Sequence, residues 1–241
     1  MQKEQSIQDI LSDTDQKTYN RKKLYVAMVL DQSGSMMRGA RETVDGFNEQ
    51  IQSVREGLED QLDVEVIFTT FGSSAAIQKD FVNINEMADL TDDDYCPAGL
   101  TAMYDGVGIT INALKERSDI NSDDTKVLMV ILSDGAENNS KQFTQSDVAE
   151  MIQDVKDTGR WTITYMGANQ DLSEITAGLN IDAGNTVVFD ASDAVGYAKG
   201  AAMRSAATTM YMSGVAGAAG DAGPMGDVGA TQSFYADVTG D

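Results

Sequence analysis

Two kinds of hydrophobic pattern alternate along this chain. Leu24–Leu30 and Val127–Leu132 are almost wholly apolar, which is typical of strands covered on both faces in the middle of a parallel sheet. Trp161–Met166 predicts a further central strand. Alternating apolar residues predict a half-buried strand over residues 62–68, and residues 77–84 are predicted as an edge strand.

Between these strands, apolar residues recur at spacings of three and four and predict amphipathic helices. The three stripes consist of Val44, Phe47, Ile51, Val54 and Leu58, then Met103, Val107, Ile111 and Leu114, and then Val148, Ile152 and Val155. An alanine-rich segment from Ala191 to about Met212 predicts a last helix. Strands separated by such helices predict an α/β fold with a doubly wound, Rossmann-like sheet. We expect this sheet to be mainly parallel, with one antiparallel edge strand and helices on both faces.

The chain of 241 residues fits one domain of about 200 residues with appended ends. We place a polar N-terminal extension at 1–21, the domain at 22–212 and a tail at 213–241. In the tail, glycine recurs every third residue from Gly214 to Gly229. This period suits a collagen-like triple helix, but with one proline in the repeats a flexible linker is the other interpretation. Residues 233–238 are apolar enough to dock on this domain or on a partner.

Charge and composition exclude several classes of protein. Seventeen basic and thirty-nine acidic residues give a net charge of −22, which disfavours binding to nucleic acid or to an anionic membrane surface. No apolar run is long enough to span a bilayer, and the N-terminus does not resemble a signal peptide. Cys96 is the only cysteine, so no internal disulfide can form. We therefore expect a cytoplasmic location, in a bacterium or in a host cell if the protein is viral.

Histidine is absent, which excludes imidazole catalysis and histidine-bound zinc. The nearest enzymatic alternative is a metal-dependent phosphatase with an aspartate nucleophile after its first strand. Such enzymes carry D-x-D at this point, whereas here Ser33 replaces the second acid. A hydroxyl cannot serve as the carboxylic acid that this chemistry needs, so we do not expect an enzyme.

Polar side chains follow the predicted strands at three separated loops. The first apolar strand runs into Asp31-Gln32-Ser33-Gly34-Ser35, Thr101 lies in Ala98–Asp105, and Asp134 follows the second buried strand. Loops after central parallel strands meet at the carboxyl edge of a doubly wound sheet. Two carboxylates and three hydroxyls suit a hard divalent cation, Mg²⁺, Mn²⁺ or Ca²⁺.

In order and spacing, these motifs resemble the metal-ion-dependent adhesion site of von Willebrand factor type A (VWA) domains. The resemblance covers roughly residues 22–210. Within the family, the chain is similar to compact, single-domain versions from bacteria and their viruses. It implies that the serines of the first loop and the threonine of the second hold the metal, while the aspartates bind directly or through water. On this chain these roles fall on Asp31, Ser33, Ser35, Thr101 and Asp134.

The resemblance further implies metal-bridged protein binding. The family leaves one coordination position open, which an Asp or Glu carboxylate of a partner protein completes. The alternative is a structural component, for example of a phage particle, that assembles through its glycine-repeat tail. The chain would then be a tail-dependent oligomer, whereas the adhesion module is expected to be a monomer.

Residues next to the proposed ligands leave two interpretations open. Met36 and Met37 either fill the core or offer an apolar edge to a partner, and packing is the preferred interpretation. Glu137 either acts on the ligands from behind or is a first-turn acid or a solvated loop residue.

Overall fold

A computed structural model describes residues 22–58, 60, 62–168, 172–190, 194–220 and 234–235. The predicted extension at 1–21 and the last three repeat glycines, Gly223, Gly226 and Gly229, lie outside these residues. In chain order the elements are β1 (Lys22–Asp31), η1 (Gly34–Gly39), α2 (Ala40–Glu56), β2 (Leu62–Phe71), β3 (Ala75–Asn83), α3 (Met103–Lys115), β4 (Thr125–Ser133), α4 (Gln145–Lys156), β5 (Trp161–Ala168), α5 (Leu172–Leu179), η2 (Ala183–Asn185), β6 (Thr186–Phe189) and α6 (Ala194–Gly220).

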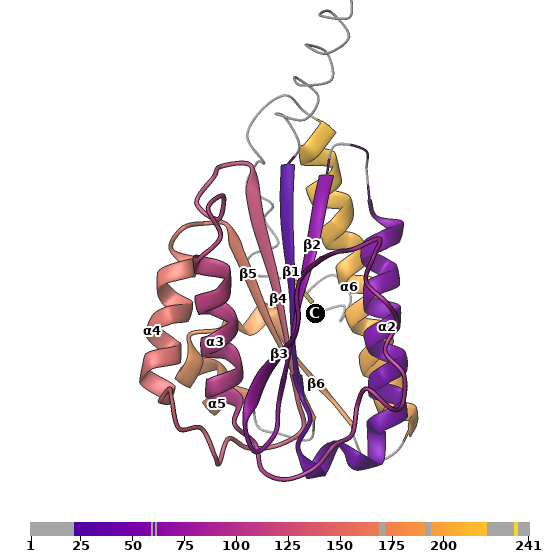
Figure 1. Ribbon diagram of the computed structural model, residues 1–241, viewed down its shortest axis with the longest axis vertical. Helices are drawn as coiled ribbons and strands as arrows, with labels where there is room; N and C mark the ends of the chain where they lie inside the picture. The colour runs from indigo at the N-terminus through magenta and orange to yellow at the C-terminus, as the bar shows by residue number, and fades with distance from the viewer. Residues whose placement is uncertain are drawn as a thin grey trace, which may run out of the picture.

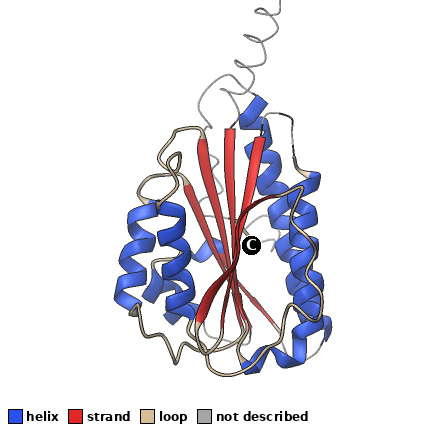
Figure 2. Ribbon diagram, viewed as in Figure 1, coloured by secondary structure: helices blue, strands red, loops and turns tan. Residues whose placement is uncertain are grey.

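A six-stranded sheet in the order β3-β2-β1-β4-β5-β6 forms the middle layer of the molecule. All neighbouring strands are parallel except β2 and β3, which are antiparallel. Helices α2 and α6 cover one face, and α3, α4 and α5 cover the other (Figures 1 and 2). The predicted α/β class, the mainly parallel sheet and the antiparallel edge strand are therefore confirmed.

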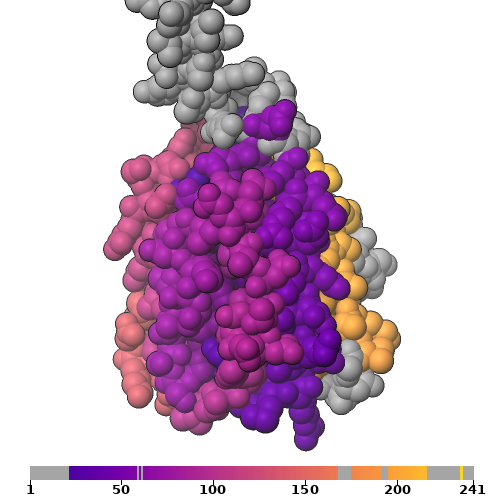
Figure 3. Space-filling model, turned by 45° about the vertical axis from the view of Figure 1, so that its right-hand side comes forward, coloured from indigo at the N-terminus to yellow at the C-terminus, as the bar shows by residue number. Residues whose placement is uncertain are grey.

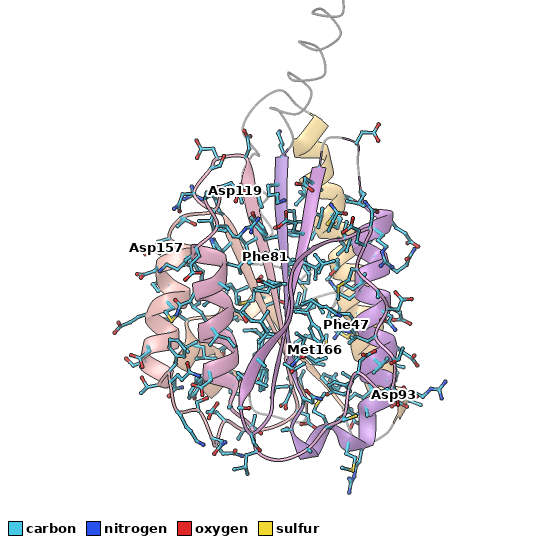
Figure 4. The ribbon with its side chains drawn as sticks, in the orientation of Figure 1. Phe47, Phe81, Asp93, Asp119, Asp157 and Met166 are labelled. Carbon is cyan, nitrogen blue, oxygen red and sulfur yellow. The ribbon has the colours of Figure 1, made fainter. Side chains whose placement is uncertain are left out.

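The continuous apolar run of β1 is explained by its place in the centre of the sheet. All ten of its residues are buried, and the side chains from Leu24 to Leu30 alternate between two hydrophobic cores. Leu24 and Val26 pack toward α2 and α6, whereas Tyr25 and Ala27 pack toward α3 and α4. Phe47 reaches from α2 toward the sheet in the same way (Figure 4).

A long connection between β3 and α3, residues 84–102, runs over the α2 side of the molecule. Its buried side chains Met87, Leu90 and Tyr95 belong to the same core as α2. The Asn48 side chain both donates to the Leu90 carbonyl, at 3.0 Å, and accepts from the Leu90 N–H, at 2.8 Å. Figure 3 shows this magenta connection lying against the purple surface of the preceding elements.

Two elements, α5 and β6, have no counterpart among the predicted elements, and the last helix is longer than predicted. Helix α6 continues past Met212 to Gly220, so the first three glycines of the period, Gly214, Gly217 and Gly220, lie in an α-helix. The polyproline-II interpretation therefore does not hold for these three glycines. Phe234 and Tyr235 are buried against the α6 side of the core, with exposures of 5% and 1%.

Candidate metal centre

The register of the two central strands brings Asp31 and Asp134 together. Strands β1 and β4 pair with Leu30 opposite Leu132, so Asp31 and Ser133 end neighbouring strands and Asp134 follows directly. These carboxyl ends lie at the lower edge of the sheet in Figure 1. Residues about one hundred positions apart thus meet at one edge because the strands are parallel.

Asp31 is fully buried, and its side chain is held at both oxygens. Its Oδ1 accepts a hydrogen bond from the Ser33 N–H at 2.7 Å, and its Oδ2 accepts one from the Ser133 hydroxyl at 2.5 Å. Burial raises the pKa of Asp31, the two serines oppose that rise, and the nearby charge of Asp134 adds to it. This carboxylate is therefore a site at which a cation would be favourable.

A chain of hydrogen bonds links the first loop to Asp134. The hydroxyls of Ser33 and Ser35 lie 3.0 Å apart, and the Ser35 hydroxyl donates to Asp134 Oδ1 at 2.5 Å. Ser33 is buried, whereas Ser35 is exposed, so the chain leads from the interior to the surface.

Gly135 shows that Thr101 belongs to the same cluster. A Cβ placed on Gly135 would lie 3.3 Å from both the Ser35 hydroxyl and the Thr101 hydroxyl, and 3.8 Å from Asp31 Oδ2. The three oxygens therefore surround a space that a larger residue at position 135 would fill. Of the five residues predicted from the sequence, Asp31, Ser35 and Thr101 border this space, and Ser33 and Asp134 are joined to it by hydrogen bonds with Ser35.

The loop after β4 holds Thr101 in place from behind. The Thr101 N–H donates to the Asn138 side chain at 2.9 Å, and the Thr101 carbonyl accepts from the backbone N–H groups of Asn138 and Asn139. Glu137 accepts from the Tyr104 N–H at 3.1 Å and from the Ser140 N–H at 2.7 Å. Glu137 therefore ties the start of α3 to the loop after β4, and the interpretation that it acts on the ligands from behind stays a prediction.

Asp105 anchors the same loop and was not singled out from the sequence. It is buried, and its carboxylate accepts backbone N–H bonds from Lys141, Gln142 and Phe143 at 2.8–3.0 Å. Its own N–H donates to the Ser140 hydroxyl at 3.1 Å. Helix α3 has no side-chain cap from its own N-cap residue, so this loop supplies partners for two N–H groups of its first turn.

Two further side chains near the site were not predicted in these roles. Tyr197, from the first turn of α6, donates to Asp134 Oδ2 at 3.4 Å. The hydroxyl of Tyr95 donates to the Asp31 carbonyl. Burial raises the pKa of both tyrosines, so both keep their protons and act as donors.

Met36 and Met37 have opposite environments. Met36 is fully buried, as the preferred interpretation states, but Met37 is 65% exposed, so the packing interpretation is wrong for Met37. Consecutive residues of a 3₁₀ helix such as η1 point about 120° apart, which turns one methionine inward and the other outward.

The described residues contain no group of three or more His, Cys, Asp and Glu side chains placed to hold a metal. A cation at this edge would therefore depend on the hydroxyls of Ser33, Ser35 and Thr101 as well as on the two aspartates. Over the same residues, no helix combines the length and the apolar character that crossing a membrane requires.

No protein-family model matches the sequence, and neither does any curated protein. Solved structures do match the fold. The vWF domain of the type V pili tip protein Mfa5 from Porphyromonas gingivalis aligns over 76% of this chain and 95% of its own length, with a TM-score of 0.54 and 12% identity. The chain has a von Willebrand factor type A fold. The resemblance predicted from the motifs is confirmed at the level of the fold.

Two other structures with this fold also align with most of the chain. A von Willebrand factor type A protein from Catenulispora acidiphila aligns over 78% of this chain with a TM-score of 0.53 and 17% identity. The manganese-loaded TRAP protein of Plasmodium vivax aligns over 75% of this chain and 72% of its own, with a TM-score of 0.50 and 16% identity. This chain spans only 43% of the length of the Catenulispora structure.

Proposed function

We propose that this VWA domain is a protein-binding module that holds a divalent cation at its carboxyl edge. The observation that carries the proposal is the space around Gly135, which is bordered by the hydroxyls of Ser35 and Thr101 and by Asp31 Oδ2. The Ser35 and Asp31 oxygens belong to the first loop and the Thr101 hydroxyl to the second, and Asp134 of the third loop joins them through its hydrogen bond with Ser35.

Ser33, Ser35 and Thr101 would supply hydroxyl ligands, and Asp31 and Asp134 would supply negative charge. An oxygen-only set of this kind fits Mg²⁺, Mn²⁺ or Ca²⁺ and does not favour softer metals. The manganese-loaded TRAP structure, which shares the fold, supports a divalent cation. When bound, the cation would supply a positive charge that attracts a carboxylate.

The electrostatics of the two aspartates support this proposal. Burial and the neighbouring Asp134 both raise the pKa of Asp31, so two ionised carboxylates at this edge are unfavourable without a counter-charge. A divalent cation would offset both charges and leave the site neutral. An incoming Asp or Glu of a partner protein would then complete the coordination without meeting net negative charge.

The proposal is tested by titrating Mg²⁺ into the purified chain in a calorimeter and by thermal unfolding with Mg²⁺ and with chelator. At a concentration one hundred times its Kd, a cation that binds only the native state stabilises it by about 2.7 kcal/mol. We expect Asp31→Ala to lose this stabilisation. Asp45→Ala, at an exposed position on α2, is the matched control and should keep it. Full Mg²⁺ affinity in Asp31→Ala would contradict the proposal.

A further inference from the structure

Two of the large exposed hydrophobic side chains in the described part of the chain flank the proposed ligands. Met37, 65% exposed, closely follows Ser35, and Leu100, 50% exposed, directly precedes Thr101. Exposed apolar side chains scattered over a surface are ordinary. These two differ from the others because both belong to the loops that carry the candidate ligands. We refer to Met37 and Leu100 as the apolar rim.

Local backbone structure fixes the exposure of Leu100. Gly99 has a φ of +78°, and a Cβ there would lie 2.1 Å from the Ser73 hydroxyl, so only glycine fits this turn. The same hydroxyl accepts a hydrogen bond from the Leu100 N–H at 3.1 Å. The loop is therefore fixed to the segment that follows β2, in a conformation that leaves the Leu100 side chain exposed to solvent.

Hydrogen bonds also tie the two ligand loops to each other. The Gly34 N–H donates to the Gly99 carbonyl at 3.1 Å, and the Ala98 N–H donates to the Gln32 carbonyl at 2.9 Å. The two segments that carry Met37 and Leu100 are therefore joined to each other by backbone hydrogen bonds next to the candidate ligands.

Charge near the rim limits the kind of partner that can bind. A hollow of about 360 Å³ beside Met37 is lined by Arg38, Arg41, Glu42 and Asp92 among others, and these four charges sum to zero. Asp92 and its exposed neighbours Asp93 and Asp94 form an acidic run at this end of the molecule, where Figure 4 labels Asp93. A strongly acidic partner segment would be repelled by this run, whereas a single carboxylate directed at the cation would not.

We infer that the partner presents one Asp or Glu flanked by large apolar side chains, and that Met37 and Leu100 bind those apolar side chains. The inference rests on the proposed function, because the acidic side chain is the one that reaches the cation. The apolar rim adds affinity by removing apolar surface from water on both sides of the contact. It also discriminates against acidic segments that are polar throughout.

The probe is a random heptapeptide library displayed on filamentous phage and selected on the immobilised full chain in Mg²⁺, with bound clones released by chelator. The recovered peptides are synthesised and their affinities are measured for the unmodified chain and for Met37→Ser and Leu100→Ser. Met210→Ser is the matched control, because Met210 is 47% exposed on α6, away from the ligand loops. A separate calorimetric titration measures Mg²⁺ binding by each variant without peptide.

We expect chelator-released peptides to share one acidic residue next to a large apolar residue. Replacing that apolar residue by serine should weaken binding about tenfold, and Met37→Ser or Leu100→Ser should have a similar effect. Met210→Ser should bind as the unmodified chain does, and all three variants should keep their Mg²⁺ affinity.

The outcomes separate this inference from the proposed function. If binding needs Mg²⁺ and an acidic residue but shows no apolar preference and no effect of Met37→Ser or Leu100→Ser, the inference fails and the proposed function stands. Recovery of no chelator-released peptide by a chain that binds Mg²⁺ would also overturn the inference. If the chain binds no Mg²⁺, the proposed function fails, and the inference fails with it.

Discussion

The hydroxyl of Tyr197 donates to Oδ2 of Asp134 at 3.4 Å and so connects the last helix to the candidate metal centre. Gly39 lies against the other side of this tyrosine, because a Cβ there would fall 2.2 Å from the ring. Tyr197 is thus held between η1 and the end of β4, and its position depends on both.

Tyr197→Phe should raise Mg²⁺ affinity slightly. The hydroxyl donates to one oxygen of Asp134, and its removal would leave that oxygen free for the proposed cation. Because the bond is long, we expect a gain of about twofold to threefold by calorimetry. Tyr211→Phe, at a buried position farther along the same helix, should leave the affinity unchanged. A marked loss of affinity in Tyr197→Phe would show that the hydroxyl supports the bound state.

Gly135→Ala should abolish most Mg²⁺ binding while the chain stays folded. The added methyl group would lie 3.3 Å from two proposed ligand hydroxyls and would take up the space that the cation needs. We expect at least about a tenfold loss of Mg²⁺ affinity in a calorimetric titration.

Gly159→Ala provides the contrast for this test. Gly159 has a φ of +67° and no atom near its Cβ position, so alanine there strains the backbone without touching the site. We expect a loss of about 1 kcal/mol in the free energy of unfolding and no change in Mg²⁺ affinity. If Gly135→Ala kept its Mg²⁺ affinity, the cation would have to bind at another place on the chain.

Asp105→Ala should destabilise the chain because three backbone N–H groups lose the buried carboxylate that accepts their hydrogen bonds. We expect the free energy of unfolding in urea to fall by about 2–4 kcal/mol. Asp147→Ala removes the capping box at the exposed start of α4 and should cost only about 1 kcal/mol. Equal losses in the two variants would mean that Asp105, which anchors the loop between β4 and α4, contributes no more to stability than an ordinary helix cap.

Phe234→Ala should also destabilise the domain, although Phe234 lies within the predicted tail. Its ring is buried against Tyr211 and Tyr235, with ring centroids 5.8 and 4.9 Å away. Loss of such a side chain costs about 3–5 kcal/mol. Val188→Ala, at a half-exposed position on β6, should change stability by less than about 0.5 kcal/mol. An unchanged stability in Phe234→Ala would contradict the docking of this part of the tail on the domain.

The central strands and the longer helices could be predicted because their hydrophobic periods are strong and uninterrupted. Strand β6 has only four residues, and α5 has eight, so neither gives enough repeats to be distinguished from a loop. The five candidate ligands were identified from the resemblance of their motifs to the adhesion site of VWA domains, and their role in holding a metal stays a prediction. Their convergence follows from the register of β1 and β4, which a sequence pattern does not contain.

The supporting residues could not be predicted for a different reason. Glu137 and Asp105 hold backbone N–H groups of segments more than thirty residues away in the chain, so no local spacing indicates their roles. Tyr197 lies in an alanine-rich helix whose apolar residues form no clear stripe, and only the packed structure shows which side chain meets Asp134.

The pairing of β1 with β4 determines when the proposed cation site can form during folding. Asp31 and Asp134 meet only after two strands separated by nearly a hundred residues have joined, and such long-range pairings form late and slowly in folding. A partly folded chain would hold at most one ligand loop and would have little affinity for a cation. Metal ions would then act almost entirely on the finished fold, slowing its unfolding while leaving its folding rate nearly unchanged.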